Sequence, residues 1–131
     1  EHVYDPLAVL RGARDVLDTG GKLFIEVPNY RSWDVRYFSH ASIYLDLPRH
    51  LLHFSPETLS AVVGRAGFRV EQVTVRCRAN AFAKALKVAP QLRGPGKWDT
   101  LLKLKLGRGA VAKLCQWRGT GNIIELLAGK I

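Results

Sequence analysis

The feature that most constrains this chain is a helical pattern that stops at a glycine pair and changes at once into a short apolar run. Asp5 and Pro6 predict the helix start, because Asp caps a first turn and Pro has the fixed φ of the first helical position. Leucines recur at helical spacing until the glycines at 20 and 21. The mostly continuous apolar run over residues 23–27 is typical of a strand covered on both faces, as in a parallel sheet.

The same order recurs after a long connection. Ser55 and Pro56 predict a second helix start, apolar residues follow at helical spacing, and Gly67 predicts the end. Residues 68–75 then alternate imperfectly between apolar and polar, which predicts a strand with one polar face. Helix, strand, long loop, helix and strand over residues 5–76 are typical of an α/β fold with a largely parallel sheet.

The excess positive charge lies in the second part of the chain. The 131 residues carry a net charge of +9, yet residues 1–76 have nine cationic and nine acidic side chains, against eleven and two in residues 77–131. Residues 79–118 interleave lysine with leucine, alanine and valine, which predicts two or three short basic amphipathic helices, and residues 123–128 predict a final strand. We therefore expect one incomplete domain over residues 1–131, with an α/β portion (1–76), a basic helical insertion (77–118) and a final strand segment (119–131).

The composition also argues against a disordered chain and against a membrane-spanning protein. Hydrophobic residues make up 47% and charged residues 24%, which is typical of a globular chain. No apolar run approaches the roughly 20 residues that span a bilayer, and no signal-peptide pattern is present. The two separated cysteines, Cys77 and Cys115, favour reduced core residues of an intracellular protein. We expect a cytoplasmic location, with peripheral membrane contact as a further expectation.

Five segments in order resemble the second half of a class I S-adenosylmethionine (SAM) dependent methyltransferase. They are "EHVYDP", "GGKLFIEVPN", "HFSPETL…AGF", "RVEQVTV" and, more weakly, "GTGNIIELLAGKI". The resemblance is to the broad group that includes the ubiquinone-biosynthesis O-methyltransferases. It implies the C-terminal half of a Rossmann-like seven-stranded sheet, with strands five to seven present and a basic helical insertion before the last strand. It also implies SAM as cofactor, although the glycine-rich SAM loop of the family precedes these segments, so we expect a fragment that is inactive alone.

The resemblance also implies site residues. Ligands of open parallel sheets bind beyond the carboxyl ends of the strands, where Glu1 and His2 follow one expected strand and Asn29 and Tyr30 follow another. The expected cofactor-binding residues are Glu1, His2 and Val3. The expected catalytic residues are Glu1, His2 and His53. His2 suits a general base, because imidazole exchanges its proton near neutral pH.

Some members of the group hold a divalent metal with glutamate and histidine, and Glu1, His2 and His53 match part of that pattern. Carboxylate and imidazole together suit Mg²⁺, Mn²⁺ or Zn²⁺. The expected substrate-binding residues are Asn29, Tyr30, Tyr44, Arg49 and His50. Two alternatives stay open: the histidines of the loop before residue 55 only bond the main chain, and the aromatic residues within 31–49 belong to the core.

We expect methyl transfer to an oxygen of a small or lipid-like acceptor. The alternative function is a non-catalytic basic module that binds an anionic membrane surface or RNA. For residues 79–118, three interpretations are open: an insertion with a solvated lysine face, a membrane-surface contact, or phosphate contact with nucleic acid. Few aromatic residues and no binding motif make nucleic acid the least favoured partner.

Overall fold

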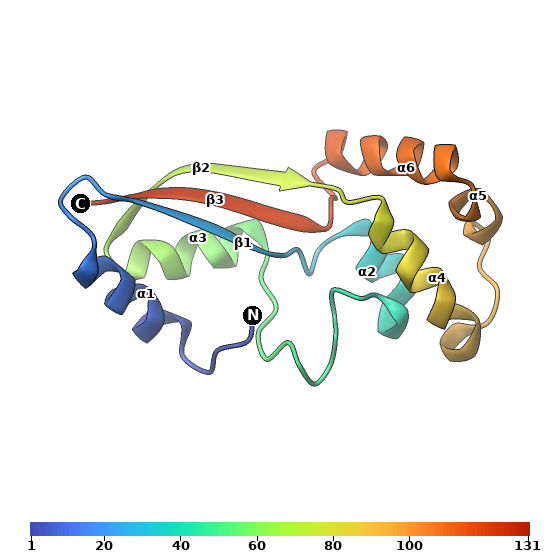
Figure 1. Ribbon diagram of the computed structural model, residues 1–131, viewed down its shortest axis with the longest axis horizontal. Helices are drawn as coiled ribbons and strands as arrows, with labels where there is room; N and C mark the ends of the chain where they lie inside the picture. Colours follow the sequence, from blue (N-terminus) through green and yellow to red (C-terminus); the bar gives the residue numbers. More distant parts are fainter.

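The computed structural model describes residues 1–131, apart from the side chain of Arg93. In chain order the elements are α1 (Pro6–Val16), β1 (Lys22–Pro28), α2 (Trp33–Phe38), the 3-10 turn η1 (Ser39–Ala41), α3 (Pro56–Arg65), β2 (Phe68–Arg76), α4 (Asn80–Arg93), α5 (Asp99–Lys103), α6 (Lys105–Trp117) and β3 (Ile123–Lys130). The molecule is elongated, with the sheet, α1 and α3 towards one end and α2, α4, α5 and α6 at the other (Figure 1).

The sheet has the order β1-β3-β2, and β3 runs antiparallel to both neighbours. The prediction of a largely parallel sheet is therefore wrong for these strands: β1 and β2 point the same way but do not pair. Five of the eight β3 residues are buried, which suits the central position, where a strand has neighbours on both edges. The strand predicted at residues 123–128 is confirmed and extends to Lys130. The three strands lie within the part of the chain that the structure describes, and the seven-stranded sheet stays a prediction.

Only one face of the sheet is covered. Helices α1 and α3 pack on that face, with Val63, Ile124 and Leu126 at the centre of the apolar cluster. On the other face Phe24 is 60% exposed, so the prediction that β1 is covered on both faces is wrong. Charged side chains of the strands, and of Arg78 just after β2, pair across this open face. The pairs are Arg78–Glu26 at 2.6 Å, Arg76–Glu125 at 2.6 Å and Lys22–Glu71 at 2.5 Å.

Local signals set both predicted helix starts. The Asp5 carboxylate accepts the Ala8 N–H at 3.0 Å, and Ser55 and Thr58 form a reciprocal capping box at the start of α3. Gly67 follows α3 with φ +89°, a left-handed conformation that favours glycine. The two helices are therefore confirmed.

A second apolar cluster forms the other end of the molecule. It centres on Phe38, Phe82 and Leu102, and so joins α2, α4 and α5. Trp33 stacks on Tyr37 with ring centroids 4.8 Å apart, so these loop aromatics belong to the core. The predicted basic helices are present as α4, α5 and α6. No helix in the described part of the chain is long and apolar enough to cross a membrane.

Two buried asparagines join the strand ends to the helical end. Asn29 is 1% exposed; its side chain donates to the Gly121 carbonyl at 2.8 Å and accepts the Arg31 N–H at 3.0 Å. Asn122 accepts the Arg78 N–H at 2.8 Å and donates to the Arg78 carbonyl at 3.3 Å. The ends of all three strands are thus tied together where the two apolar clusters meet.

Candidate functional site

The first residues of the chain lie beside the loop that precedes α3. The N–H groups of Leu51 and Leu52 both donate to the Glu1 carbonyl, at 2.8 and 3.2 Å. The Nδ1 atom of His2 lies 3.2 Å from the Arg49 carbonyl. Segments almost fifty residues apart in sequence are therefore held together by main-chain bonds.

This contact groups Glu1, His2 and His50. The Oε1 atom of Glu1 is 3.7 Å from Nε2 of His2, and the rings of His2 and His50 are 4.8 Å apart. One potential ligand atom from each of the three residues lies within 4.8 Å of the others. The predicted set had His53 in place of His50; the structure brings His50 to Glu1 and His2, with the His53 ring 6.5 Å from that of His50.

The hydrogen bonds of these histidines define which nitrogen faces a main-chain carbonyl, and Nε2 of His50 lies 3.9 Å from Oδ2 of Asp46. Nδ1 of His50 lies 3.0 Å from the Tyr44 carbonyl, and Nδ1 of His2 faces the Arg49 carbonyl. A carbonyl only accepts, so in each neutral ring Nδ1 carries the proton and Nε2 keeps its lone pair. Histidines that bind metals usually donate their second N–H in this way. Glu1, His2 and His50 therefore have the chemistry of a divalent-cation site.

His53 faces a different space. Its Nε2 lies 3.1 Å from the Leu45 carbonyl, so that nitrogen donates and Nδ1 keeps the lone pair. The main chain after β1 brings Tyr30 to this side, because the Tyr30 N–H donates to the Phe54 carbonyl at 2.8 Å. The Tyr30 and His53 rings are 5.6 Å apart. Both line a cavity of about 860 Å³ whose walls also include Arg31 and Arg36.

A buried carboxylate anchors the loop that orients both histidines. Asp34 accepts hydrogen bonds from the hydroxyls of Ser32 at 2.7 Å and Ser42 at 3.0 Å. Burial raises the pKa of Asp34, and the two serine hydrogen bonds partly oppose that rise. The Ser42 hydroxyl also accepts the Tyr44 N–H at 3.3 Å. Ser42 thus fixes the turn whose carbonyls, from Tyr44 and Leu45, hold His50 and His53.

The other predicted residues are placed as follows. Tyr44 lines a smaller cavity of about 240 Å³ with Glu1, Glu26 and His50. Burial, with the charge of Asp34, raises the pKa of Tyr44 to about 12, so its phenol stays protonated. Arg49 is exposed and pairs with Asp46 at 3.1 Å.

Two predicted residues do not reach these spaces. Asn29 has its amide committed to main-chain groups and lines neither the 860 Å³ nor the 240 Å³ cavity. Val3 is partly buried and also lines neither of them.

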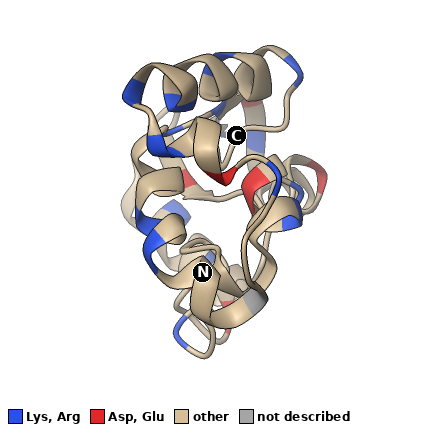
Figure 2. Ribbon diagram, turned by 90° about the vertical axis from the view of Figure 1, so that its right-hand side faces the viewer, with Lys and Arg blue, Asp and Glu red and all other residues tan. Residues whose placement is uncertain are grey.

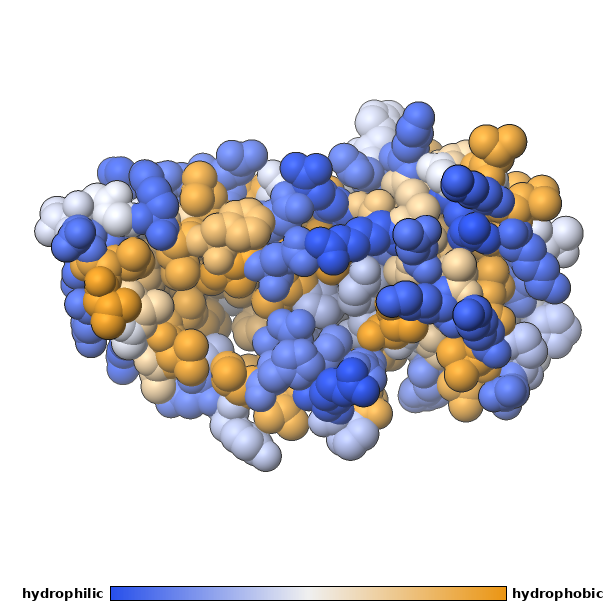
Figure 3. All heavy atoms as spheres, viewed as in Figure 1, coloured by the Kyte–Doolittle hydropathy of each residue, from blue (hydrophilic) through white to orange (hydrophobic). Residues whose placement is uncertain are grey.

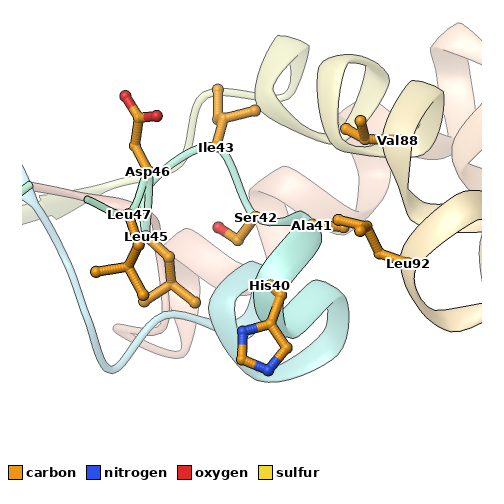
Figure 4. A pocket seen from close by; sticks show the side chains of 9 residues that line it. All are labelled: His40, Ala41, Ser42, Ile43, Leu45, Asp46, Leu47, Val88 and Leu92. Atoms are coloured by element: carbon orange, nitrogen blue, oxygen red, sulfur yellow. The ribbon is translucent and has the colours of Figure 1, made fainter. Parts of the chain in front are cut away.

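A third cavity, of about 390 Å³, lies apart from the predicted catalytic residues. Figure 4 shows Val88 and Leu92 of α4 on one side of it and Leu45 and Leu47 of the loop on the other. Its lining is largely apolar, and none of the predicted catalytic histidines contributes to it. Its lining also includes His40 and Asp46, two titratable side chains that the sequence-based site did not contain.

Sequence reasoning missed Asp34 and Arg36. Both lie in α2, a helix of six residues that is too short to show a helical period. The "S-W-D" start, with Ser32 as cap and an acidic residue in the first turn, is the signal that could have located it.

One comparison with known proteins decides the family. A family model described as "Methyltransferase domain" matches residues 1–73, more than half of the chain. The chain belongs to the methyltransferase domain family. A search of curated proteins found no match.

The match places the histidine-bearing loop inside the methyltransferase domain. The matched segment runs from Glu1 through α1, β1, α2 and α3 into β2. It includes Glu1, His2, Tyr30, His50 and His53. The helices α4, α5 and α6 and the central strand β3 lie beyond the matched residues.

Proposed function

We propose that this methyltransferase domain acts in SAM-dependent methyl transfer to an oxygen of a small or lipid-like acceptor, which binds in the 860 Å³ cavity at Tyr30 and His53. The observation that carries the proposal is the free Nδ1 of His53 at the wall of that cavity, fixed by the bond from Nε2 to the Leu45 carbonyl. A hydroxyl acceptor must lose a proton as its oxygen gains a methyl group, and a positioned imidazole can take that proton.

The rest of the cavity suits such an acceptor. Its volume lies within the range of ligand pockets, roughly 300–1,000 Å³. Arg31 and Arg36 would stabilise negative charge that develops on the acceptor oxygen. The Tyr30 ring and Leu45 supply apolar wall for the body of the molecule. His53 would accept the proton at Nδ1 while Leu45 keeps the ring in place.

The cofactor itself fits these residues only in part. SAM is a sulfonium cation, yet no acidic side chain lines the 860 Å³ cavity. The smaller cavity contains Glu1 and Glu26 but, at about 240 Å³, is below the usual size of a cofactor site. These cavities therefore do not form a complete SAM site, and the residues described act on the acceptor. SAM would supply the methyl group.

Glu1, His2 and His50 would hold a divalent cation if the enzyme uses one. The fit rests on two Nε2 lone pairs and one carboxylate, with both Nδ1 atoms bonded to carbonyls. A bound cation there would supply a Lewis acid beside the 240 Å³ cavity, which Glu1 and His50 line. The "EHV" and "IEVPN" segments also support a relation to the ubiquinone-biosynthesis group, which methylates oxygen of lipid-like phenols.

A His53→Gln variant tests the proposal. Glutamine can still donate to the Leu45 carbonyl but cannot take a proton near neutral pH. In the full-length enzyme, with labelled SAM and a panel of phenols that includes prenylated ones, we expect turnover to fall by about 10²- to 10⁴-fold in the variant. Val16→Gln serves as control, because Val16 is 86% exposed on α1 and lines neither cavity. Turnover that is unchanged by His53→Gln would refute the role of this residue.

A thermal-shift measurement on the full-length protein separates the enzyme from the non-catalytic alternative. A methyltransferase that binds SAM should melt at a higher temperature with SAM present. A binding module without a cofactor site would show no such shift. This outcome does not depend on knowledge of the acceptor.

A further inference from the structure

Helix α6 exposes two of the largest apolar side chains of the molecule. Leu106 is 90% exposed and Trp117 is 80% exposed. They lie near opposite ends of α6, and the adjacent Leu104 is exposed as well. At the α6 end of the molecule, hydrophobic and strongly hydrophilic residues lie side by side on the surface (Figure 3). Single exposed apolar residues are common, whereas exposed apolar residues that lie together on a surface mark interaction sites.

The exposed residues form one stripe. Leu106, Ala110, Lys113 and Trp117 follow each other at spacings of four, three and four, which places them on one helix face. The opposite face is buried through Gly107, Ala112 and Cys115. This stripe of four residues is called the outer stripe below.

Close packing fixes the direction of the outer stripe. A Cβ atom at Gly107 would come within 2.2 Å of the Leu101 carbonyl oxygen, so α6 lies against the end of α5. Arg108 donates to the carbonyls of Leu102 at 3.0 Å and Lys103 at 2.9 Å. Helix α6 therefore cannot turn its outer stripe inward without losing these contacts.

The charge around the stripe has one sign. Lys105, Lys113 and Arg118 are exposed on α6 or directly after it, and Lys97 and Lys103 are exposed on or next to α5. The acidic residue of this region, Asp99, is buried and accepts a hydrogen bond from the Tyr37 hydroxyl at 3.1 Å. Seen from this end, Lys and Arg lie along the helix at the top (Figure 2). The outer stripe, with two large apolar side chains and Lys113 between them, thus lies in a cationic surface.

We propose that the outer stripe docks this protein on an anionic lipid bilayer. Leu106 and Trp117 would enter the boundary between headgroups and acyl chains, while the lysines stay among anionic headgroups. Tryptophan favours that boundary because its ring is apolar and its N–H remains hydrated. Long lysine side chains can extend to the headgroups from the flanks of a half-immersed helix.

Charge argues against the two other occupants. A second copy of this chain would bring cationic stripes face to face, and like charges at an interface oppose association. Nucleic acid would satisfy the lysines but leave the Leu106 side chain against phosphate or solvent. A bilayer with anionic lipids satisfies the apolar and the cationic side chains together. The proposal is independent of the methyl acceptor and of catalysis.

Vesicle flotation tests this inference. Vesicles of phosphatidylcholine with about one third phosphatidylserine should carry the protein upward, and vesicles of phosphatidylcholine alone should carry much less. The double variant Leu106→Ser/Trp117→Ser should bind the anionic vesicles at least about tenfold more weakly than the wild-type protein. Val16→Ser is the matched control, because Val16 is 86% exposed on α1 at the other end of the molecule. The control should bind like the wild-type protein.

Variants that remove positive charge provide a second test of membrane docking. Lys105→Gln and Lys113→Gln should each weaken binding about fivefold, and added salt should weaken it further. The blue shift of tryptophan fluorescence on binding should be smaller in Trp117→Ser, which keeps the partly exposed Trp98. These positions are exposed, so thermal melting should match the wild-type protein in every variant.

Three results would overturn the inference. Equal vesicle binding by the double variant and wild type would show that the outer stripe does not dock. A wild-type dimer in sedimentation that the double variant abolishes would identify a second copy as the occupant. Salt-sensitive retention on RNA without vesicle binding would identify nucleic acid instead.

Discussion

Replacing Ser42 by alanine should destabilise the protein through the buried Asp34 carboxylate. Ser42 is 3% exposed, and its hydroxyl donates to Asp34 at 3.0 Å and accepts the Tyr44 N–H at 3.3 Å. A hydrogen bond to a charged group contributes about 1.5–3 kcal/mol, and a buried N–H left without its acceptor adds a cost of similar order. We therefore expect Ser42→Ala to lower the free energy of unfolding by about 2–4 kcal/mol.

Urea denaturation at neutral pH, followed by circular dichroism, measures this loss. Ser60→Ala is the matched control, because the Ser60 hydroxyl donates at 2.7 Å to the Pro56 carbonyl of its own helix. That bond satisfies no buried charge, so its loss should change stability by less than about 0.5 kcal/mol. If Ser42→Ala is no more destabilising than Ser60→Ala, the argument that Ser42 supports the Asp34 carboxylate is wrong.

The same variant should also disturb the histidines. The Tyr44 and Leu45 carbonyls that hold His50 and His53 follow Ser42 directly in the chain. Long-range ¹H–¹⁵N correlation spectra distinguish the two imidazole tautomers. The wild-type protein should show an Nδ1–H form for His50 and an Nε2–H form for His53, and the variant should show mixtures. Unchanged tautomers would mean that the loop holds its shape without Ser42.

Burial raises the pKa of Asp34 above its unfolded value of 3.8. The protonated form therefore stabilises the folded state fully below pH 3.8. This contribution is lost as the pH rises through the pKa of the folded state. The unfolding free energy of the wild type relative to Asp34→Asn should therefore fall over that range in urea titrations, and a difference that is flat with pH would contradict the raised pKa. In Mn²⁺ calorimetry, His50→Ala should weaken binding by about tenfold or more, whereas His53→Ala should not. Equal losses in both variants would favour the set predicted from sequence. Phe82→Ala should cost about 3–5 kcal/mol, because Phe82 is fully buried. Leu92→Ala, at an exposed position of the same helix, is its control. A similar loss of unfolding free energy in Leu92→Ala would show that the second apolar cluster is not well packed.

Local signals made α1 and α3 predictable. The caps at Asp5 and Ser55 and the left-handed Gly67 act over a few residues, so the sequence alone contains the information. The direction of strand pairing could not be predicted, because a parallel core strand and an antiparallel strand can both contain the same apolar run. In β1 the exposed Phe24 hides an alternation that its neighbours Lys22 and Glu26 would otherwise show.

The candidate site was predictable in residue type but not in arrangement. His50 and His53 stand three apart in a loop without a regular period, so spacing cannot say which one meets Glu1. The carbonyls of Tyr44 and Leu45 decide it, and these depend on the buried pair of Asp34 and Ser42. Such a chain of contacts depends on tertiary structure, which a linear pattern does not record.

The two buried asparagines limit how this domain can be redesigned. Asn29 and Asn122 bond main-chain groups at both places where the helical segment leaves and rejoins the sheet. A foreign segment grafted between Arg78 and Gly121 would have to present its own main chain at the same two points. Otherwise two amides in the interior would be left without partners, at a cost of about 1–3 kcal/mol each. Helices of many lengths could be exchanged here, but the geometry of the two junctions could not.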